Sequence, residues 1–294
     1  MKVLVIYEPD LTGHLLLERL QKTTLEVVPL LLSQPESLDP GSVQDWLTED
    51  IDLVVNLLTL DDPQAVEMDP AMARHRLLAL PAALADAAAA REIAMLQLSS
   101  CYIFDGRKQS SYLASNPGQP LGLLGQLLWQ SEQHLRSVLP RHILLRTSWP
   151  LRRFCQFLLQ QQGTLAPLHL SSRYRGQPVP AADLARVITA ILQQIDCGAE
   201  VWGTYQYAGL EETSQFELGL TISQAMTVRP VPRLVDDMAA WMDLEPENAT
   251  LNCRKLRNTF GIKPLSWRDA LPQELAQLES PPLEGSLQGS TVIS

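Results

Sequence analysis

The chain has 294 residues, a net charge of −10 and a hydrophobic content of 46%, which suits a folded protein with one large domain or two smaller ones. The acidity disfavours nucleic acid and anionic membranes as partners, and no run approaches the roughly 20 apolar residues that a membrane span needs. Four cysteines lie far apart and form no C-x-x-C pair, so we expect free thiols, a cytoplasmic location and no metal site.

Short apolar runs alternate with helical patterns through the first half of the chain. In chain order, the expected elements are a strand at 3–6, a helix at 13–22, a strand at 25–32, a capped turn segment at 37–46, a strand at 52–58, a helix at 70–91, a strand at 93–98, a helix at 121–139 and a strand at 142–146. This alternation predicts an α/β fold, a Rossmann-like doubly wound parallel sheet with right-handed crossovers.

Helical patterns dominate the second half, where we expect a smaller mixed lobe of substrate-binding type. The expected elements are helices at 153–162, 181–195, 214–226 and 233–242, with a strand at 204–208. We therefore divide the chain into a Rossmann-like domain at 1–155, a smaller lobe at 156–280 with some strands returning to the main sheet, and a disordered tail at 281–294, which is rich in Pro, Gly and Ser.

The most specific motif follows the strand expected at 93–98. Residues 99–106 read SSCYIFDG, which resembles the S-T-D-Y-V-F-D-G of the dTDP-4-dehydrorhamnose reductases, a family of the extended short-chain dehydrogenase/reductases. Four further segments match family motifs in the same order: 52–56 (D-V-V-I-N), 146–149 (R-T-S-W), 203–205 (G-x-Y/F-H) and 246–252 (R-P-x-x-S-x-L-N). The resemblance covers roughly residues 1–275 and indicates a degenerate member of this family.

The resemblance implies a catalytic pair that this chain lacks. In the family, a tyrosine donates a proton to the ketone oxygen, and a lysine one helical turn later lowers the pKa of that tyrosine. Leu124 and Leu128 stand at these two positions, and neither can transfer a proton. We therefore expect a remnant cleft without catalytic residues; its members would be Ser100, Cys101, Tyr102, Leu124, Leu128, Ser148 and Trp149.

The phosphate-binding positions that the resemblance implies are also altered. The family opens with a G-x-x-G-x-x-G turn that brings its backbone close to the cofactor diphosphate. Here Tyr7, Asp10 and Gly13 occupy these places; Tyr7 is expected to fill the diphosphate's space and Asp10 to repel it. Glu245 replaces a substrate-binding arginine. We expect no cofactor, and the residues that would contact NAD(P), if it bound, are Leu11, Thr12, Gly13 and Asn56.

Three functions stay open, and the altered positions favour the first. It is a pseudoenzyme, a non-catalytic scaffold that binds a protein partner, a second copy or a nucleotide-like ligand. The second is an NAD(P)H-dependent sugar-nucleotide reductase with a substituted proton donor, such as Tyr102, Tyr112 or a water held by Ser100. The third is a different enzyme that uses Cys101 as its nucleophile, which would require a thiol of low pKa.

Overall fold

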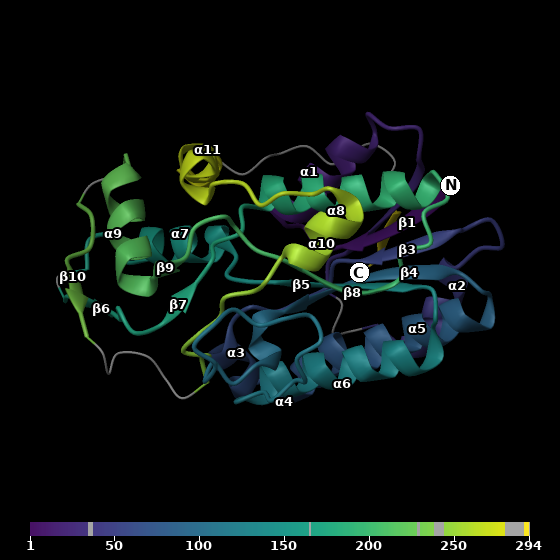
Figure 1. The fold of residues 1–294 in the computed structure, drawn as a ribbon, viewed down its shortest axis with the longest axis horizontal. Helices are drawn as coiled ribbons and strands as arrows, with labels where there is room; N and C mark the ends of the chain where they lie inside the picture. Colours follow the sequence, from purple (N-terminus) through teal and green to yellow (C-terminus); the bar gives the residue numbers. More distant parts are fainter. Residues whose placement is uncertain (35–37, 165, 228–229, 238–243, 280–290, 294) are drawn as a thin grey trace.

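A seven-stranded parallel sheet forms the centre of the molecule (Figure 1). The computed structural model describes residues 1–34, 38–164, 166–227, 230–237, 244–279 and 291–293. The spatial order of the strands is β11-β2-β1-β3-β4-β5-β8. From β1 the chain first adds β2 on one side and then β3, β4, β5 and β8 on the other, so the order of strand addition reverses between β1 and β3. The strand bounds are β1 Lys2–Tyr7, β2 Glu26–Leu32, β3 Leu53–Asn56, β4 Ala94–Ser100, β5 His142–Thr147, β8 Gly203–Tyr207 and β11 Thr291–Ile293.

Helices cover both faces of this sheet (Figure 1). One face carries α1 (Leu11–Leu20), α8 (Ala181–Asp196) and α10 (Arg254–Phe260). The other carries α2 (Val43–Trp46), α5 (Leu80–Ala90) and α6 (Leu123–Val138). Short segments connect these layers: η2 Pro40–Ser42, α3 Pro63–Met68, α4 Pro70–Arg74, the π-helical η3 His75–Ala79 and η4 Cys101–Ile103.

The first strand illustrates why the sheet is buried on both sides. Successive side chains of a strand point to opposite faces. Accordingly Val3 and Val5 pack in the core under α1 and α8, whereas Leu4 and Ile6 pack in the core under α2 and α5. An uninterrupted apolar run is what a parallel strand between two helical layers requires.

A smaller lobe lies at one end of the sheet, on the left in Figure 1. It contains α7 (Leu151–Gln160), α9 (Gln215–Ala225) and α11 (Trp267–Glu279). Two short sheets complete it: β6 (Leu168–Leu170) pairs with β10 (Leu234–Asp236), and β7 (Arg175–Gly176) pairs with β9 (Thr213–Ser214). A third apolar core joins this lobe to α6 and to the loop after β4.

The predicted α/β doubly wound fold is confirmed, and two local predictions are wrong. Residues 233–242 were expected to form a helix, but Leu234–Asp236 pairs with β6 as a strand; residues 238–243 lie outside the described residues. The tail was expected to be disordered, but Thr291–Ile293 extends the main sheet beside β2. The β-branched Thr-Val-Ile sequence suits a pleated edge strand; residues 281–290 and 294 lie outside the described residues.

The segments after residue 155 do not stay within the smaller lobe. Helices α8 and α10 and strand β8 belong to the main sheet and its helical layer. The return of a strand was expected; the return of two helices was not. Within the described ranges, no helix combines the length and apolarity needed to cross a bilayer.

Candidate functional site

The carboxyl ends of β1, β3, β4 and β5 converge on a small cavity beside the point where the strand order reverses. Open α/β sheets bind their ligands at this place. The cavity measures about 110 Å³, whereas small-molecule sites begin at about 300 Å³. Its polar lining includes Asp10, Thr12, Asp61, Ser99, Ser148 and Arg152.

Asp10 caps the helix that points at this cavity. Helix α1 begins directly after it, and the Asp10 Oδ1 atom accepts a hydrogen bond from the backbone nitrogen of Gly13 at 2.8 Å. Asp10 as a whole residue is exposed. Desolvation of its carboxylate nevertheless raises the pKa of Asp10, and the hydrogen bond from Gly13 opposes this rise. The chain's own carboxylate therefore occupies the anion-binding end of α1.

A dinucleotide diphosphate at this end of α1 would compete with the Asp10 carboxylate for the backbone nitrogen of Gly13. The diphosphate would need the helix end that Asp10 already caps, and two negative groups would meet there. Glu8, in the same loop, is bound to the Arg76 guanidinium, which also donates to the carbonyl oxygen of Thr59 at 3.2 Å. These contacts tie the loop to the segment after β3 and to η3.

Tyr7 does not enter the cleft, which corrects the expectation that it fills the diphosphate's space. Its side chain is buried in the core beneath α1. A Cβ atom built on Gly13 would lie 2.5 Å from the Tyr7 Cδ2 atom. The surviving glycine therefore makes room for the Tyr7 ring in this structure.

The candidate cofactor residues are placed differently from one another. Thr12 lines the cavity, whereas Leu11, Gly13 and Asn56 do not. Asn56 is fully buried at the end of β3, and its Oδ1 atom accepts from the backbone nitrogen of Leu58 at 3.1 Å. Its Nδ2 atom has no hydrogen-bond partner within the part of the chain that the structure describes.

Leu124 and Leu128 lie in the third apolar core, one turn apart on α6. They are 1% and 3% exposed, and neither lines the cavity. Their neighbours in this core include Val66 and Leu77. The two positions at which the resemblance places the catalytic pair therefore serve to pack α6.

Ser100 and Cys101 are buried at the start of η4. The Ser100 hydroxyl accepts from the backbone nitrogen of Tyr102 at 3.4 Å and lies 3.7 Å from the Cys101 sulfur. Burial raises the pKa of the Cys101 thiol to about 12, despite the Ser100 contact. A buried thiol of such high pKa is a poor nucleophile, so the geometry argues against the hypothesis based on Cys101.

Tyr102 is held by a half-buried arginine and a buried carboxyl group. The Arg153 Nη1 atom lies 2.7 Å from the Tyr102 hydroxyl, which donates to Glu245 Oε1 at 2.9 Å. Arg153 also forms an ion pair with Glu245 at 3.5 Å. Desolvation, reinforced by the Glu245 charge, raises the pKa of Tyr102 far above its usual range. The glutamate that replaces the expected arginine has thus gained an arginine partner from α7.

The other candidate tyrosine lies away from the cavity. The Tyr112 ring stacks on Phe104 with centroids 4.1 Å apart, and its hydroxyl donates to Asp105 Oδ1 at 2.8 Å. Desolvation raises the pKa of Tyr112 to about 12. Neither Tyr102 nor Tyr112 lines the cavity as a proton donor would.

Ser148 and Trp149 diverge after β5. Ser148 lines the cavity, and its hydroxyl donates to the carbonyl oxygen of Ala249 at 2.9 Å. Trp149 is buried against Phe154, with ring centroids 5.2 Å apart, and against Gly176. The tryptophan therefore builds the core of the smaller lobe.

Sequence reasoning missed Asp61, Arg152 and Arg153. Asp61 lines the cavity after β3, and desolvation raises the pKa of its carboxyl group. Arg152 lines the cavity from α7 and lies 3.9 Å from Glu274. Their position in the sequence could have indicated these three residues, because each follows the carboxyl end of a predicted strand. Among the described residues, no group of three His, Cys, Asp or Glu side chains could hold a metal ion.

The sheet order, the helices on both faces and the cavity at the reversal point define a Rossmann-like doubly wound α/β fold. The sequence pattern of the family described as "RmlD substrate binding domain" matches residues 1–280. The chain belongs to this family.

Known relatives agree with this assignment. The dTDP-4-dehydrorhamnose reductase of Aggregatibacter actinomycetemcomitans is 28% identical over 208 residues, which cover 67% of this chain and 71% of the relative. The Clostridium acetobutylicum dTDP-4-dehydrorhamnose reductase structure has a TM-score of 0.80 at 19% identity, covering 95% of this chain and all of the other. The Bacillus anthracis enzyme, in complex with NADP, has a TM-score of 0.76 at 18% identity, covering 94% and 98%. The expectation that no cofactor binds receives no support from these relatives.

Proposed function

We propose that the chain is a non-catalytic member of this family, a pseudoenzyme that keeps the reductase scaffold and binds a protein partner, a second copy or a nucleotide-like ligand. One observation carries the proposal. Leu124 and Leu128, at the two positions of the expected catalytic pair, are both buried in an apolar core away from the cavity. General acid catalysis needs a titratable group within hydrogen-bond reach of the reacting oxygen.

The cofactor end of the cleft supports the same proposal. Asp10 caps α1 with its own carboxylate, and the cavity beside it measures about 110 Å³, below the roughly 300 Å³ at which small-molecule sites begin. The four cysteines, none of them in a disulfide, support a reducing compartment such as the cytoplasm.

Calorimetric titration with NADPH and NADH tests the cofactor side of this proposal. We expect no binding below millimolar concentration for the native chain, and tighter binding for Asp10→Gly, because this substitution clears the carboxylate from the end of α1. A native chain that binds either dinucleotide in the micromolar range would overturn the proposal that the cofactor site is lost.

A second candidate is a working reductase with a substituted proton donor, and the relatives favour it. Both the sequence relative and the similar structures described above are reductases of dTDP-4-dehydrorhamnose. Among the cavity-lining groups, Asp61 best suits the role of donor, because desolvation raises the pKa of its carboxyl group and lets it hold a proton at higher pH.

An activity assay separates the two candidates. NADPH oxidation is followed with dTDP-4-dehydrorhamnose for the native chain, Asp61→Asn and Tyr112→Phe, the last being a matched loss of a titratable group outside the cavity. The pseudoenzyme proposal expects no turnover by any of them. Turnover that Asp61→Asn abolishes and Tyr112→Phe preserves would establish the reductase with Asp61 as its donor.

A further inference from the structure

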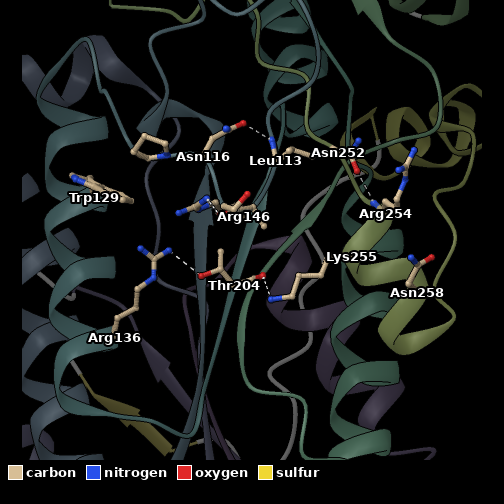
Figure 2. A pocket seen from close by; sticks show the side chains of 13 residues that line it. Leu113, Asn116, Trp129, Arg136, Arg146, Thr204, Asn252, Arg254, Lys255 and Asn258 are labelled. Carbon is tan, nitrogen blue, oxygen red and sulfur yellow. Dashed lines mark hydrogen bonds between the residues drawn. The ribbon is translucent and has the colours of Figure 1, made fainter.

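A second and larger cavity lies at the β8 edge of the main sheet. It measures about 700 Å³ and is bounded by the segment 113–117, α6, β8 and α10 (Figure 2). It shares no lining residue with the cleft cavity. Its volume falls within the range of about 300–1,000 Å³ that small-molecule sites occupy.

Four cations line this cavity, which we name the basic pocket. They are Arg136 from α6, Arg146 from β5, and Arg254 and Lys255 from α10 (Figure 2). The chain as a whole carries a net charge of −10, so this concentration of positive charge runs against its composition. Concave basic sites attract anionic ligands because the low-dielectric walls focus their field.

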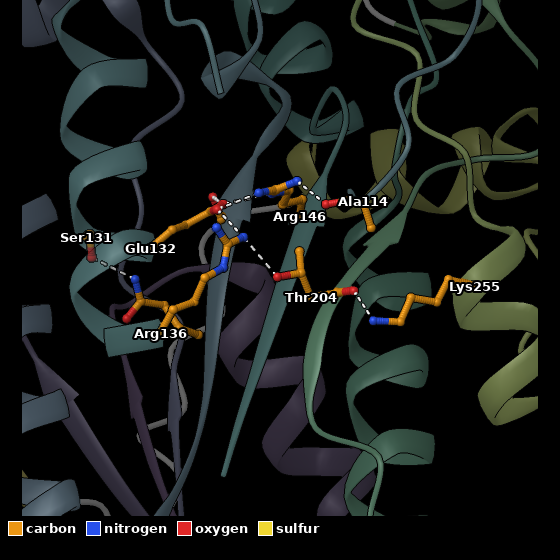
Figure 3. A network of polar contacts seen from close by, with 9 residues as sticks. Ala114, Ser131, Glu132, Arg136, Arg146, Thr204 and Lys255 are labelled. Atoms are coloured by element: carbon orange, nitrogen blue, oxygen red, sulfur yellow. Dashed lines mark hydrogen bonds and ion pairs between the residues drawn. The ribbon is translucent and has the colours of Figure 1, made fainter. Parts of the chain in front are cut away.

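The Glu132 carboxylate binds two of these arginines and is already saturated with hydrogen bonds (Figure 3). Glu132 accepts from Arg146 Nε at 2.9 Å and Nη2 at 2.6 Å, from Arg136 Nη2 at 2.9 Å, and from the Ser99 hydroxyl at 2.6 Å. It does not line the pocket. Among the described residues that line the pocket there is no carboxylate, so Glu132 compensates only part of the charge of the four cations.

Arg136 and Arg254 have N–H groups that are not used in hydrogen bonds within the described part of the chain. Arg136 Nη2 also donates to Thr204 Oγ1 at 2.9 Å, and Lys255 Nζ donates to the Thr204 carbonyl oxygen at 2.9 Å, so that the two cations approach Thr204 from opposite sides (Figure 3). Within the described part of the chain, Arg136 Nε and Nη1 and the Arg254 guanidinium have no acceptor. These N–H groups border the cavity and can bind oxyanions.

The cations also repel one another. Desolvation and then the Arg136 charge lower the pKa of Lys255. Desolvation lowers the pKa of Arg136, and Arg146 adds to this against the favourable charge of Glu132. An anion bound between Arg136 and Lys255 would offset the repulsion between their charges and raise both pKa values.

We propose that the basic pocket binds a small phosphate-bearing molecule with at least two negative charges. Arginine guanidinium groups match the oxygens of phosphate in bidentate geometry, and the pocket exceeds the size of one inorganic phosphate. Arg146 is fully buried, held by Glu132 and by the Ala114 carbonyl oxygen, and contributes its charge from the wall of the pocket. The exposed Lys255 and Arg254 supply the outer charges. The proposal is independent of the function proposed for the cleft.

Calorimetry with inorganic pyrophosphate, at a physiological salt concentration of about 0.15 M, tests the proposal. We expect micromolar affinity for the native chain and an affinity weakened about tenfold or more in Lys255→Gln and in Arg254→Gln, since each loses a charge-assisted contact. Lys263→Gln is the matched control, because it removes one exposed lysine charge outside the pocket, and its affinity should equal that of the native chain.

Two further arms identify the ligand class and the site. Citrate should bind at least tenfold more weakly than pyrophosphate; equal affinity would overturn the preference for phosphate. Asp10→Asn should leave pyrophosphate affinity unchanged, whereas a gain would place the anion at the end of α1. Absence of pyrophosphate binding by the native chain, or equal weakening by Lys263→Gln, would overturn the proposal. If NADPH binds to the native chain and Lys255→Gln abolishes this binding, the dinucleotide occupies the basic pocket and not the cleft.

Discussion

Arg146 and Glu132 form an ion pair in which both side chains are completely buried. Two hydrogen bonds join them, from Nε to Oε1 at 2.9 Å and from Nη2 to Oε2 at 2.6 Å. Removing one partner of a buried pair leaves an uncompensated charge and costs about 3–5 kcal/mol. We therefore expect Glu132→Gln to lower the free energy of unfolding by that amount in urea titrations.

Arg136→Gln provides the matched control for this pair. Its half-buried guanidinium also contacts Glu132, but Arg146 still compensates the carboxylate when it is removed. We expect a loss of about 1 kcal/mol or less. Equal losses for Glu132→Gln and Arg136→Gln would show that the buried pair contributes no more to the free energy of unfolding than the Arg136 contact.

Gly13→Ala should reverse the usual effect of alanine in a helix. Alanine within a helix is normally favoured over glycine by about 0.5–1 kcal/mol. Here the added Cβ would lie 2.5 Å from the Tyr7 ring, so we expect destabilisation of about 1–3 kcal/mol instead.

A double-mutant cycle with Tyr7→Ala isolates this contact, with thermal or urea unfolding as the measurement. The penalty of Gly13→Ala should shrink markedly when the ring is absent. An unchanged penalty would place the strain in the backbone and not at Tyr7.

Cys101 should resist alkylation at neutral pH. Burial raises the pKa of Cys101 and of Cys155 to about 12 and that of Cys253 to about 11, whereas Cys197 is exposed. A thiol is protonated below its pKa, so these three groups carry almost no thiolate at neutral pH. Mass spectrometry after iodoacetamide treatment should find Cys197 labelled first.

Unfolding in guanidinium chloride is the control for that labelling, since it should expose all four cysteines to equal reaction. Labelling of native Cys101 as fast as Cys197 would return the nucleophile hypothesis to consideration.

Leu128→Lys should destabilise the fold without creating activity. The position is 3% exposed in an apolar core, and the carboxylate one turn further along α6, Glu132, is already paired with Arg136 and Arg146. We expect a loss of several kcal/mol, comparable with other unpaired buried charges. Gln126→Lys, exposed on the same helix, should change stability by no more than about 0.5 kcal/mol. Denaturant unfolding of both variants gives the comparison, and a Leu128→Lys protein as stable as the native chain would contradict the packing role.

Of the residues that the resemblance assigned to the cleft and to the cofactor, Ser148 and Thr12 line the cavity. Leu124, Leu128 and Trp149 lie in the third apolar core instead. That Leu124 and Leu128 cannot transfer protons follows from their chemistry alone. That Asp10 caps α1, and that Tyr7 turns into the core, depends on backbone direction at the end of β1. The Tyr102–Arg153–Glu245 cluster joins side chains 51 and 143 residues apart, and no local pattern announces such a contact.

By itself the sequence determined the parallel α/β architecture, because the periodicity of hydrophobic residues is a local property. The tertiary structure alone decided the edge strand Thr291–Ile293, the small cleft cavity and the basic pocket. Arg136, Arg146 and Lys255 lie on three separate elements, and their charges meet only because β5, β8, α6 and α10 pack together. Electrostatic fields depend on distance in space, which long-range packing sets.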